Sequence, residues 1–254
     1  MTKRRDASPL LLLALLVIGA GPASGEVRKE TITVEGARRT FHLFVPPGIS
    51  AESPAPLLLL LHGSYQSGRA LLGYWTELAG RERLLLVAPD SIDQVGWQIR
   101  RDGPEFIRAV IEQVSAQQPV DDRRIYLFGL SGGAVYSLTL AMLESDYFAA
   151  TAIFAGAWRE PSFFELLPHA RRKIPVAMFV GTRDRFFPLQ DVTKTARALE
   201  AAGHPVLLEL LDGRGHAYAP VAAEVNERAW EFLRPVTLGE APAGVPAAVP
   251  GPGR

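Results

Sequence analysis

Residues 124–145 read RIYLFGLSGGAVYSLTLAMLES, and two kinds of pattern meet there at Ser131. The segment RIYL is apolar enough for a buried strand, and the segment from Val135 onward is apolar enough for a buried helix. Between the two patterns, the serine lies among three glycines. A tight turn alone needs small residues, but such a turn would also hold a serine hydroxyl clear of the sheet, where it could act as a nucleophile. The rest of the chain has to decide between these two interpretations.

Strand and helix patterns alternate along most of the chain. Continuous apolar runs, typical of strands buried on both faces, occupy residues 56–61, 84–89 and 174–181. Helical patterns lie between or after such runs, at residues 69–80, 103–117, 189–203 and 220–233. This alternation predicts an α/β fold with a mostly parallel central sheet and helices on both faces. Residues 31–46, which precede the first of these strands, predict an antiparallel pair of strands.

Parallel sheets place chemistry beyond the carboxyl ends of their strands, so a candidate site residue should follow a strand. Ser131 does, but a serine hydroxyl is a poor nucleophile unless a base takes its proton. Of the five histidines, His216 comes soon after the last predicted strand, in the segment LDGRGHAY. The base in turn needs an acid to orient it. Asp184, in GTRDRFFP after another strand, is our choice, and Asp212, at the end of the last strand, is the alternative.

A nucleophile of this kind also needs donors that stabilise the developing oxyanion. The backbone N–H of Gly132, at the start of the helix after Ser131, is one candidate donor. The segment LLLLLHGSYQSG supplies the second, because its strand ends at His-Gly and the next amide, of Ser64 or of Tyr65, can face the Ser131 turn. The sequence leaves the choice between these two amides open.

The two ends of the chain differ in composition from its middle. Lys3 and the two arginines that follow it precede an apolar run at residues 10–20 and small residues near Gly25, which is the layout of a cleavable signal peptide. We therefore expect residues 1–25 to direct export to the periplasm or beyond and then to be removed, with an uncleaved anchor as the alternative. Residues 236–254 are rich in Pro, Ala and Gly, which predicts a disordered tail. The folded domain is then expected at residues 26–235.

Composition excludes several other classes of protein. The chain has 254 residues, 48% of them hydrophobic, which suits one domain with a sizeable core. Its net charge is zero, so no nucleic-acid partner is expected, and no stable membrane insertion is expected once the signal peptide is cleaved. With no cysteine, the chain can form no disulfide, thiol nucleophile or thiolate metal site, and we expect neither a metal nor another cofactor.

Taken together, LLLLLHGSYQSG, VAPD, DDRRIYLFGLSGGA, GTRDRFFP and GRGHAY resemble the α/β-hydrolase superfamily over residues 38–233. They most resemble its exported polyhydroxybutyrate-depolymerase and feruloyl-esterase-like branch, although some members of that branch form a disulfide and this chain cannot. The resemblance implies a catalytic triad of Ser131, Asp184 and His216. It also implies oxyanion donors at Ser64 and Gly132 and substrate contacts at Tyr65 and Trp97. A purely packing role for Trp97 stays open.

These expectations favour an exported serine esterase that forms an acyl-enzyme on small or oligomeric esters. A serine peptidase on the same fold and a catalytically inactive binding module are the alternatives. Residues 157–173, between two predicted strands, are too few for an independent cap, since domains usually begin at about 50 residues. They are expected to pack against the body as an amphipathic turn, which leaves the site open.

Overall fold

The computed structural model describes residues 25–239. Almost all of the expected signal peptide and most of the expected tail, residues 1–24 and 240–254, lie outside the described residues. Residues past the expected domain boundary at 235 pack on the body, where Leu238 N–H donates to Arg123 O (2.9 Å) and Tyr126 Oη donates to Val236 O (2.7 Å). No helix within the described range is long and apolar enough to cross a membrane.

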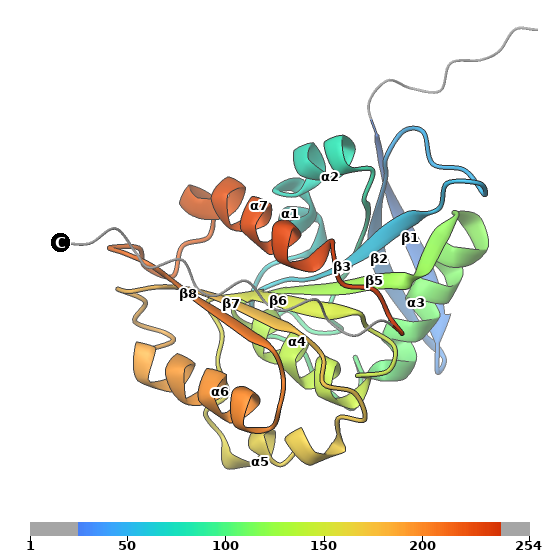
Figure 1. Cartoon of the computed structure of the whole chain (residues 1–254). Helices are drawn as coiled ribbons and strands as arrows, with labels where there is room; N and C mark the ends of the chain where they lie inside the picture. The colour runs from blue at the N-terminus through green and yellow to red at the C-terminus, as the bar shows by residue number, and fades with distance from the viewer. Residues whose placement is uncertain (1–24, 240–254) are drawn as a thin grey trace, which may run out of the picture.

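A single eight-stranded sheet, with strand order β1-β2-β4-β3-β5-β6-β7-β8, forms the centre of the molecule (Figure 1). The strands are β1 (Glu26–Val34), β2 (Ala37–Val45), β3 (Ala55–Leu61), β4 (Leu85–Pro89), β5 (Val120–Leu130), β6 (Ala150–Phe154), β7 (Val176–Gly181) and β8 (Val206–Leu211). The β1–β2 and β2–β4 pairs are antiparallel, and all other neighbours are parallel. The predicted α/β architecture and the antiparallel opening pair are therefore confirmed.

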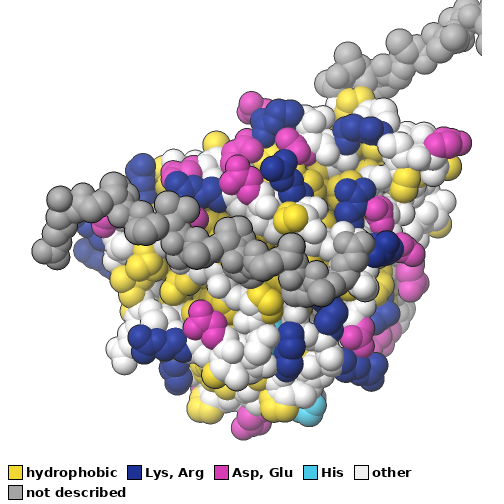
Figure 2. All heavy atoms as spheres, viewed as in Figure 1, with side chains coloured by type: hydrophobic (Ala, Val, Ile, Leu, Met, Phe, Trp, Pro, Cys, Tyr) yellow, Lys and Arg dark blue, Asp and Glu magenta, His cyan; other side chains and the backbone are white. Residues whose placement is uncertain are grey.

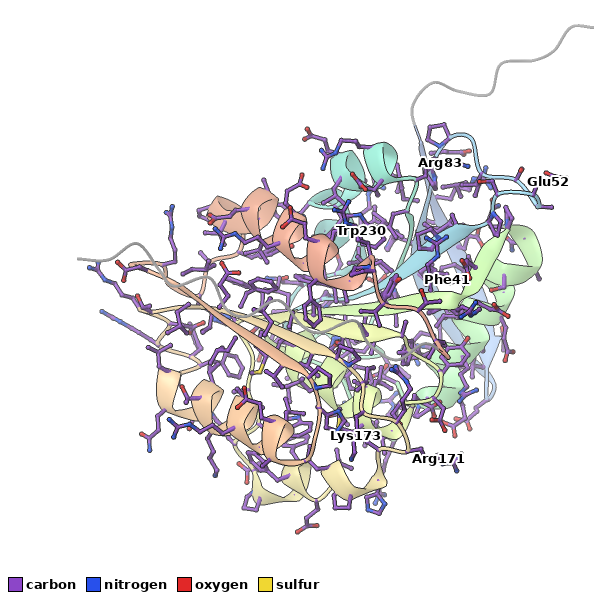
Figure 3. The ribbon with its side chains drawn as sticks, in the orientation of Figure 1. Phe41, Glu52, Arg83, Arg171, Lys173 and Trp230 are labelled. Atoms are coloured by element: carbon purple, nitrogen blue, oxygen red, sulfur yellow. The ribbon has the colours of Figure 1, made fainter. Side chains whose placement is uncertain are left out.

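Helices cover both faces of this sheet (Figure 1). They are α1 (Gly68–Gly73), α2 (Thr76–Glu82), α3 (Pro104–Gln117), α4 (Gly132–Leu143), α5 (Pro161–Phe164), α6 (Leu189–Ala201) and α7 (Ala222–Leu233), with short 3₁₀ turns η1 (Leu167–His169) and η2 (Ala219–Val221). One hydrophobic core lies between the sheet and α3, α4 and α6. A second core lies between the sheet and α1, α2 and α7, where Trp230 packs edge-on to Tyr126 with ring centroids 5.9 Å apart (Figure 3).

The alternating faces of β3 explain its unbroken run of leucines. Leu57 and Leu59 belong to the first core, whereas Leu58 and Leu60 belong to the second. All four side chains are fully buried, so neither face of the strand meets water. A central parallel strand of this kind needs apolar residues at every position rather than at every second one.

The helix expected over residues 69–80 is instead two short helices, α1 and α2. Gly73, a weak helix former, ends α1, and Trp75 then turns inward. The Trp75 ring is fully buried, edge-on to Phe128 of β5 at 4.8 Å between centroids. Burial of this large ring against the sheet bends the chain at a point where the helical periodicity of the sequence alone predicts one continuous helix.

The segment between β6 and β7 packs against the body, as expected. Its helix α5 and turn η1 place Phe163 parallel to Trp158 and Phe164 edge-on to it, with centroids 6.2 and 5.6 Å apart. Residues of the same segment contact α4, which is buried around most of its circumference. On the face seen in Figure 2, positive and negative side chains are interspersed, in keeping with the net charge of zero.

Candidate active site

Ser131 occupies a strained turn between β5 and α4. The strand ends at Leu130, the helix begins at Gly132, and Ser131 between them has φ 54° and ψ −116°. A non-glycine residue in such a conformation costs about 1–3 kcal/mol and persists only where the surrounding structure enforces it. Here Ser131 N–H donates to Phe154 O of β6 at 3.0 Å, which fixes the turn at the carboxyl edge of the sheet.

The flanking glycines are required by close approach of the backbone. A Cβ atom on Gly129 would lie 2.3 Å from Gly133 O, and one on Gly133 would lie 2.0 Å from Leu61 O. Both distances are far inside van der Waals contact, so no other residue fits without moving β3, β5 or α4. The two interpretations of the glycine-rich turn are therefore compatible, because tight packing is what lifts the serine out of the sheet.

The structure brings Ser131, His216 and Asp184 together. His216 Nε2 lies 3.0 Å from Ser131 Oγ, and His216 Nδ1 lies 2.8 Å from Asp184 Oδ2. With Nδ1–H donating to the carboxylate, Nε2 carries the lone pair that accepts the Ser131 hydroxyl proton. The three side chains follow β5, β7 and β8 at one edge of the sheet, where the positions of their strands predicted them.

Asp184 is held more firmly than the sequence indicates. Its side chain is fully buried, and its second oxygen, Oδ1, accepts the N–H groups of Phe186 (2.8 Å) and Phe187 (3.0 Å). The alternative acid, Asp212, is exposed and accepts a hydrogen bond from Thr182 Oγ1 (3.2 Å). Of the two candidates, Asp184 is the one in contact with His216.

Arg159 supports the loop that holds Asp184, and sequence reasoning missed it. The Phe186 and Phe187 rings lie 4.7 and 5.9 Å from the His216 ring, one tilted and one stacked. The Arg159 guanidinium lies 5.1 Å from the Phe187 ring centroid, donates to Phe186 O and pairs with Asp191 at 3.0 Å. This arginine thereby ties the loop to the first turn of α6.

The backbone amides of Ser64 and Gly132 lie beside the Ser131 turn and are the two candidate oxyanion donors. The Tyr65 amide is occupied, since it donates to Gln94 O at 2.6 Å, which leaves Ser64 of the two candidates. The Ser64 nitrogen lies 3.5 Å from where a Cβ on Gly132 would stand, so the two segments are in contact. Within residues 25–239, neither the Ser64 nor the Gly132 amide donates to another group. Unpaired amides beside a serine are the arrangement that an oxyanion site requires.

The two residues expected to contact substrate lie in different environments. The Tyr65 side chain is 77% exposed and free to meet a ligand. Trp97 is partly buried, stacks on Tyr136 with centroids 5.0 Å apart, and donates its Nε1–H to His62 O at 2.8 Å. Trp97 thus has the packing role that the sequence left open. Within the described residues, no cluster of His, Asp and Glu is arranged to hold a metal ion.

Two buried histidines outside the triad have lowered pKa values. His62 accepts Ser91 N–H at Nε2 (3.1 Å) and contacts Gly63 O through Nδ1 (2.8 Å), and burial lowers its pKa. His204 contacts Ile174 O through Nδ1 (3.1 Å), and burial lowers its pKa as well. Both rings are neutral in the folded chain at pH 7.

These shifts predict that stability falls on mild acidification. Below about pH 6.5 these two histidines take up protons in the unfolded chain while they stay neutral in the folded one. Their contribution to the free energy of unfolding is therefore full above that pH and decreases below it. Each residue contributes a slope of at most about 1.4 kcal/mol per pH unit. Urea unfolding between pH 7 and pH 5 should show a weaker pH dependence in His204→Gln than in the parent. The exposed His169 provides the control, and an equal slope in His204→Gln and His169→Gln would contradict the prediction.

Three features define the α/β-hydrolase fold. They are the order of the strands in the sheet, the turn from strand to helix at Ser131, and the positions of Asp184 and His216 after β7 and β8. The dienelactone hydrolase family matches residues 88–233, more than half of the chain, and the chain belongs to this family. It is a family of carboxylesterase-type hydrolases within the α/β-hydrolase superfamily, so the resemblance seen in the sequence is confirmed.

Similar proteins include several esterases. The chain is 28% identical over 165 residues to the bifunctional acetylxylan esterase/xylanase XynS20E of Neocallimastix patriciarum, covering 62% of this chain and 23% of that protein. It is 30% identical over 125 residues to poly(3-hydroxyalkanoate) depolymerase C of Paucimonas lemoignei, covering 44% of this chain and 30% of that protein. The chain thus spans roughly a quarter to a half of the length of the curated relatives it matches.

Solved structures share the fold at low sequence identity. The feruloyl esterase module from Clostridium thermocellum, complexed with sinapinate, superposes with a TM-score of 0.68 at 15% identity, covering 89% of this chain and 94% of that one. A thermostable esterase superposes with a TM-score of 0.67 at 19% identity, covering 83% and 63% of the two chains. At these identities the likeness concerns the fold alone.

Proposed function

We propose that the chain is a serine esterase in which Ser131 forms an acyl-enzyme with the help of His216 and Asp184. The observation that carries the proposal is the continuous hydrogen-bonded series from Ser131 Oγ through His216 to Asp184, at 3.0 and 2.8 Å. Such a series activates a hydroxyl that is otherwise unreactive at neutral pH. Membership of a family of carboxylesterase-type hydrolases supports the same conclusion.

In the acylation step, Ser131 Oγ attacks the ester carbonyl while its proton passes to His216 Nε2. Asp184 keeps Nδ1–H in place and stabilises the imidazolium that forms. The carbonyl oxygen becomes an oxyanion, and the Ser64 and Gly132 amides donate to it. Collapse of the tetrahedral intermediate breaks the carbon–oxygen bond, and His216 gives its proton to the departing alcohol.

In the deacylation step, water takes the place of the alcohol. His216 removes a proton from the water as its oxygen attacks the Ser131 acyl ester, and the same two amides again hold the oxyanion. The proton then returns to Ser131 Oγ as the carboxylic acid leaves. One base thereby serves both half-reactions, and the enzyme ends in its starting protonation state.

The exposed apolar side chains near Ser131 support an open site for substrates with an aromatic or apolar part. The side chains of Tyr65, Val95 and Phe186 are 77%, 60% and 66% exposed, and they follow β3, β4 and β7 at the edge that carries Ser131. An ester with an aromatic part agrees with the name of one similar protein, the feruloyl esterase module complexed with sinapinate. Oligomeric esters fit the same open site.

An open site predicts ordinary saturation kinetics on soluble short-acyl and aryl esters. The segment between β6 and β7 packs beside α4, so this segment does not have to move before the substrate enters. Initial rates should be measured across the critical micelle concentration of one ester series, with matched amides as the control for a peptidase. Rates near zero on monomers with a jump at the micelle concentration would contradict the open site, and preference for amides would contradict the esterase.

We further propose that residues 1–25 are an export signal that is removed and that the hydrolase domain runs from residue 26 past the expected end at 235, since Val236 and Leu238 pack on the body. The first described strand begins at Glu26, directly after the expected cleavage site, which supports this boundary. N-terminal sequencing of the exported chain, with Glu26 expected as the first residue, tests the cleavage.

A further inference from the structure

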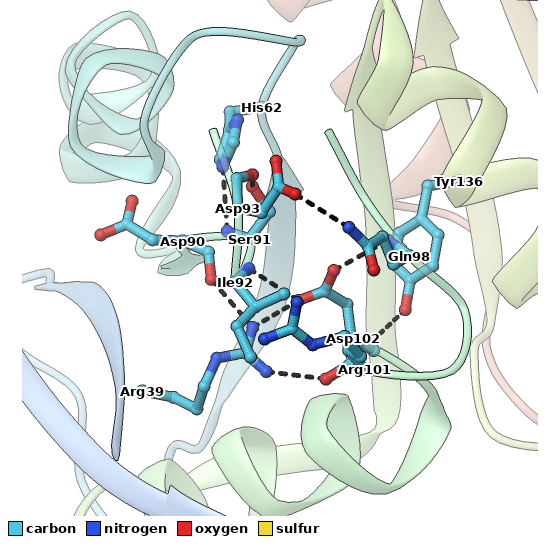
Figure 4. Close-up of polar contacts among 10 residues, drawn as sticks. All are labelled: Arg39, His62, Asp90, Ser91, Ile92, Asp93, Gln98, Arg101, Asp102 and Tyr136. Atoms are coloured by element: carbon cyan, nitrogen blue, oxygen red, sulfur yellow. Dashed lines mark hydrogen bonds and ion pairs between the residues drawn. The ribbon is translucent and has the colours of Figure 1, made fainter. Parts of the chain in front are cut away.

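A buried ion pair joins β2 to the loop after β4. The Arg39 guanidinium and the Asp102 carboxylate are 4% and 0% exposed and lie in direct contact (Figure 4). Arg39 also donates to Arg101 O (2.8 Å) and to Asp90 O (3.2 Å). The desolvation of two charges often outweighs their mutual attraction, so the pair is weak evidence for a contribution to stability alone. Its other contacts indicate a second role.

Asp102 holds the loop of residues 91–102 at two separate points. Its Oδ1 accepts Ile92 N–H at 2.9 Å, and its Oδ2 accepts Gln98 N–H at 2.8 Å (Figure 4). The Asp102 carbonyl accepts the Tyr136 hydroxyl of α4, the helix that begins directly after Ser131. One carboxylate at the end of this loop therefore binds both its start, at Ile92, and its second half, at Gln98.

The same loop holds the residues on both sides of Ser64. On one side, Ser91 N–H donates to His62 Nε2 (3.1 Å) and Trp97 Nε1–H donates to His62 O (2.8 Å). On the other side, Tyr65 N–H donates to Gln94 O (2.6 Å). The Ser64 N–H belongs to the same planar peptide unit as the Gly63 carbonyl, which accepts Gln66 N–H (3.1 Å) and contacts His62 Nδ1 (2.8 Å). These bonds to the carbonyl fix the direction of the Ser64 amide.

We propose that Asp102 and Arg39 are positioning residues that aim the Ser64 amide at the oxyanion. Neither side chain touches the reacting atoms; both act through the loop of residues 91–102. This inference rests on the esterase function proposed above. Oxyanion donors work only when they stand 2.7–3.1 Å from the position of the oxyanion, and a displacement of about 1 Å can cost a factor of about 100 in rate.

Asp102→Asn tests the proposal with little change in volume. An amide has one carbonyl oxygen, so Ile92 N–H or Gln98 N–H loses its acceptor, and Arg39 loses its counter-charge. We expect kcat to fall about 10- to 100-fold. KM should change little, and affinity for a boronic acid, whose tetrahedral adduct fills the oxyanion site, should fall with kcat. Trp97→Phe, which removes the donor to His62 O and keeps an aromatic ring against Tyr136, should have a smaller effect of the same kind.

Arg172→Met is the matched control for a purely structural loss. Arg172 donates to Ser145 O and Ala149 O, at the amino end of β6 and so at the opposite edge of the sheet. This variant should lose stability in urea yet keep kcat and boronic acid affinity. An Asp102→Asn protein that is folded and keeps both parameters while losing stability, as Arg172→Met should, would overturn the positioning role.

Hydrogen–deuterium exchange separates this proposal from the esterase function, because it needs no turnover. Exchange of the peptide spanning residues 62–67 should be faster in Asp102→Asn and in Trp97→Phe than in the parent, and unchanged in Arg172→Met. Unchanged exchange in the first two variants contradicts the positioning role whether or not the parent is active. A parent that hydrolyses no ester contradicts the proposed function alone.

Discussion

Replacing Ser131 by alanine is expected to lower kcat on esters by a factor on the order of 10⁶. The hydroxyl is the group that His216 Nε2 contacts, at 3.0 Å, and alanine leaves no oxygen there to attack a carbonyl. The fold should be unaffected, because the Ser131 side chain makes no capping hydrogen bond at the start of α4. Purified variant and parent should be compared by kcat and by thermal unfolding.

Ser137→Ala provides the matched control for this experiment. Ser137 is a buried serine in α4, the helix that follows Ser131, and its Oγ lies 3.0 Å from Thr151 Oγ1. Removal of the Ser137 hydroxyl should lower the stability of the protein and leave kcat nearly unchanged. A Ser131→Ala preparation that keeps even a tenth of the parental activity would contradict the assignment of the nucleophile.

Asp184→Asn is expected to lower kcat by a factor on the order of 10⁴, because it imposes the wrong tautomer on His216. Two N–H groups, of Phe186 and Phe187, donate to Asp184 Oδ1, so the asparagine must keep its carbonyl oxygen at that position. Its NH₂ group then faces His216 Nδ1, which has to become an acceptor. The ring proton moves to Nε2. This nitrogen then faces Ser131 as a donor and cannot accept the proton of the Ser131 hydroxyl.

Asp212→Asn separates this effect from the loss of a nearby negative charge. Asp212 follows β8, where it accepts a hydrogen bond from Thr182 Oγ1, and the asparagine can keep that bond. Its kcat should stay close to that of the parent, whereas His216→Ala should abolish turnover. Losses of the same size in Asp184→Asn and Asp212→Asn would show that the acid has been assigned wrongly.

The sequence predicts the fold and the geometry of the site for the same reason. Apolar runs and helical periodicity report burial directly, and burial fixes which segments become central strands. Once the strands are known, the residues after their carboxyl ends must meet at one edge, which brings Ser131, Asp184 and His216 together. The glycines around Ser131 add the strained turn between strand and helix, and the structure contains it.

The supporting contacts could not be predicted in this way, because they depend on which loops meet. The choice of Ser64 over Tyr65 depends on the carbonyl of Gln94, which takes up the Tyr65 amide. The contacts of Arg159 with the loop after β7 and the inward turn of Trp75 likewise leave no periodic signal. These features arise from tertiary packing between segments distant in sequence.

One supporting residue did leave a signal that could have been followed. In β2, Arg39 is two residues from Phe41 and four from Leu43, which places all three side chains on the same, inward face of the strand. A cation on a buried face requires an acidic partner, and a search for one would have pointed to Asp102 or another acid after a neighbouring strand. The carboxyl group itself, in an irregular polar loop, carries no pattern of its own.

The most direct test of the central claim is to map the adduct formed with a fluorophosphonate by mass spectrometry of the intact chain and its peptides. Only a serine activated by a base reacts readily with such a probe. We expect one adduct per chain, located on Ser131, absent from Ser131→Ala and formed far more slowly in Asp184→Asn. An active preparation that carries its adduct on another residue, or that hydrolyses esters while Ser131 stays unmodified by excess probe, would show that Ser131 is not the nucleophile.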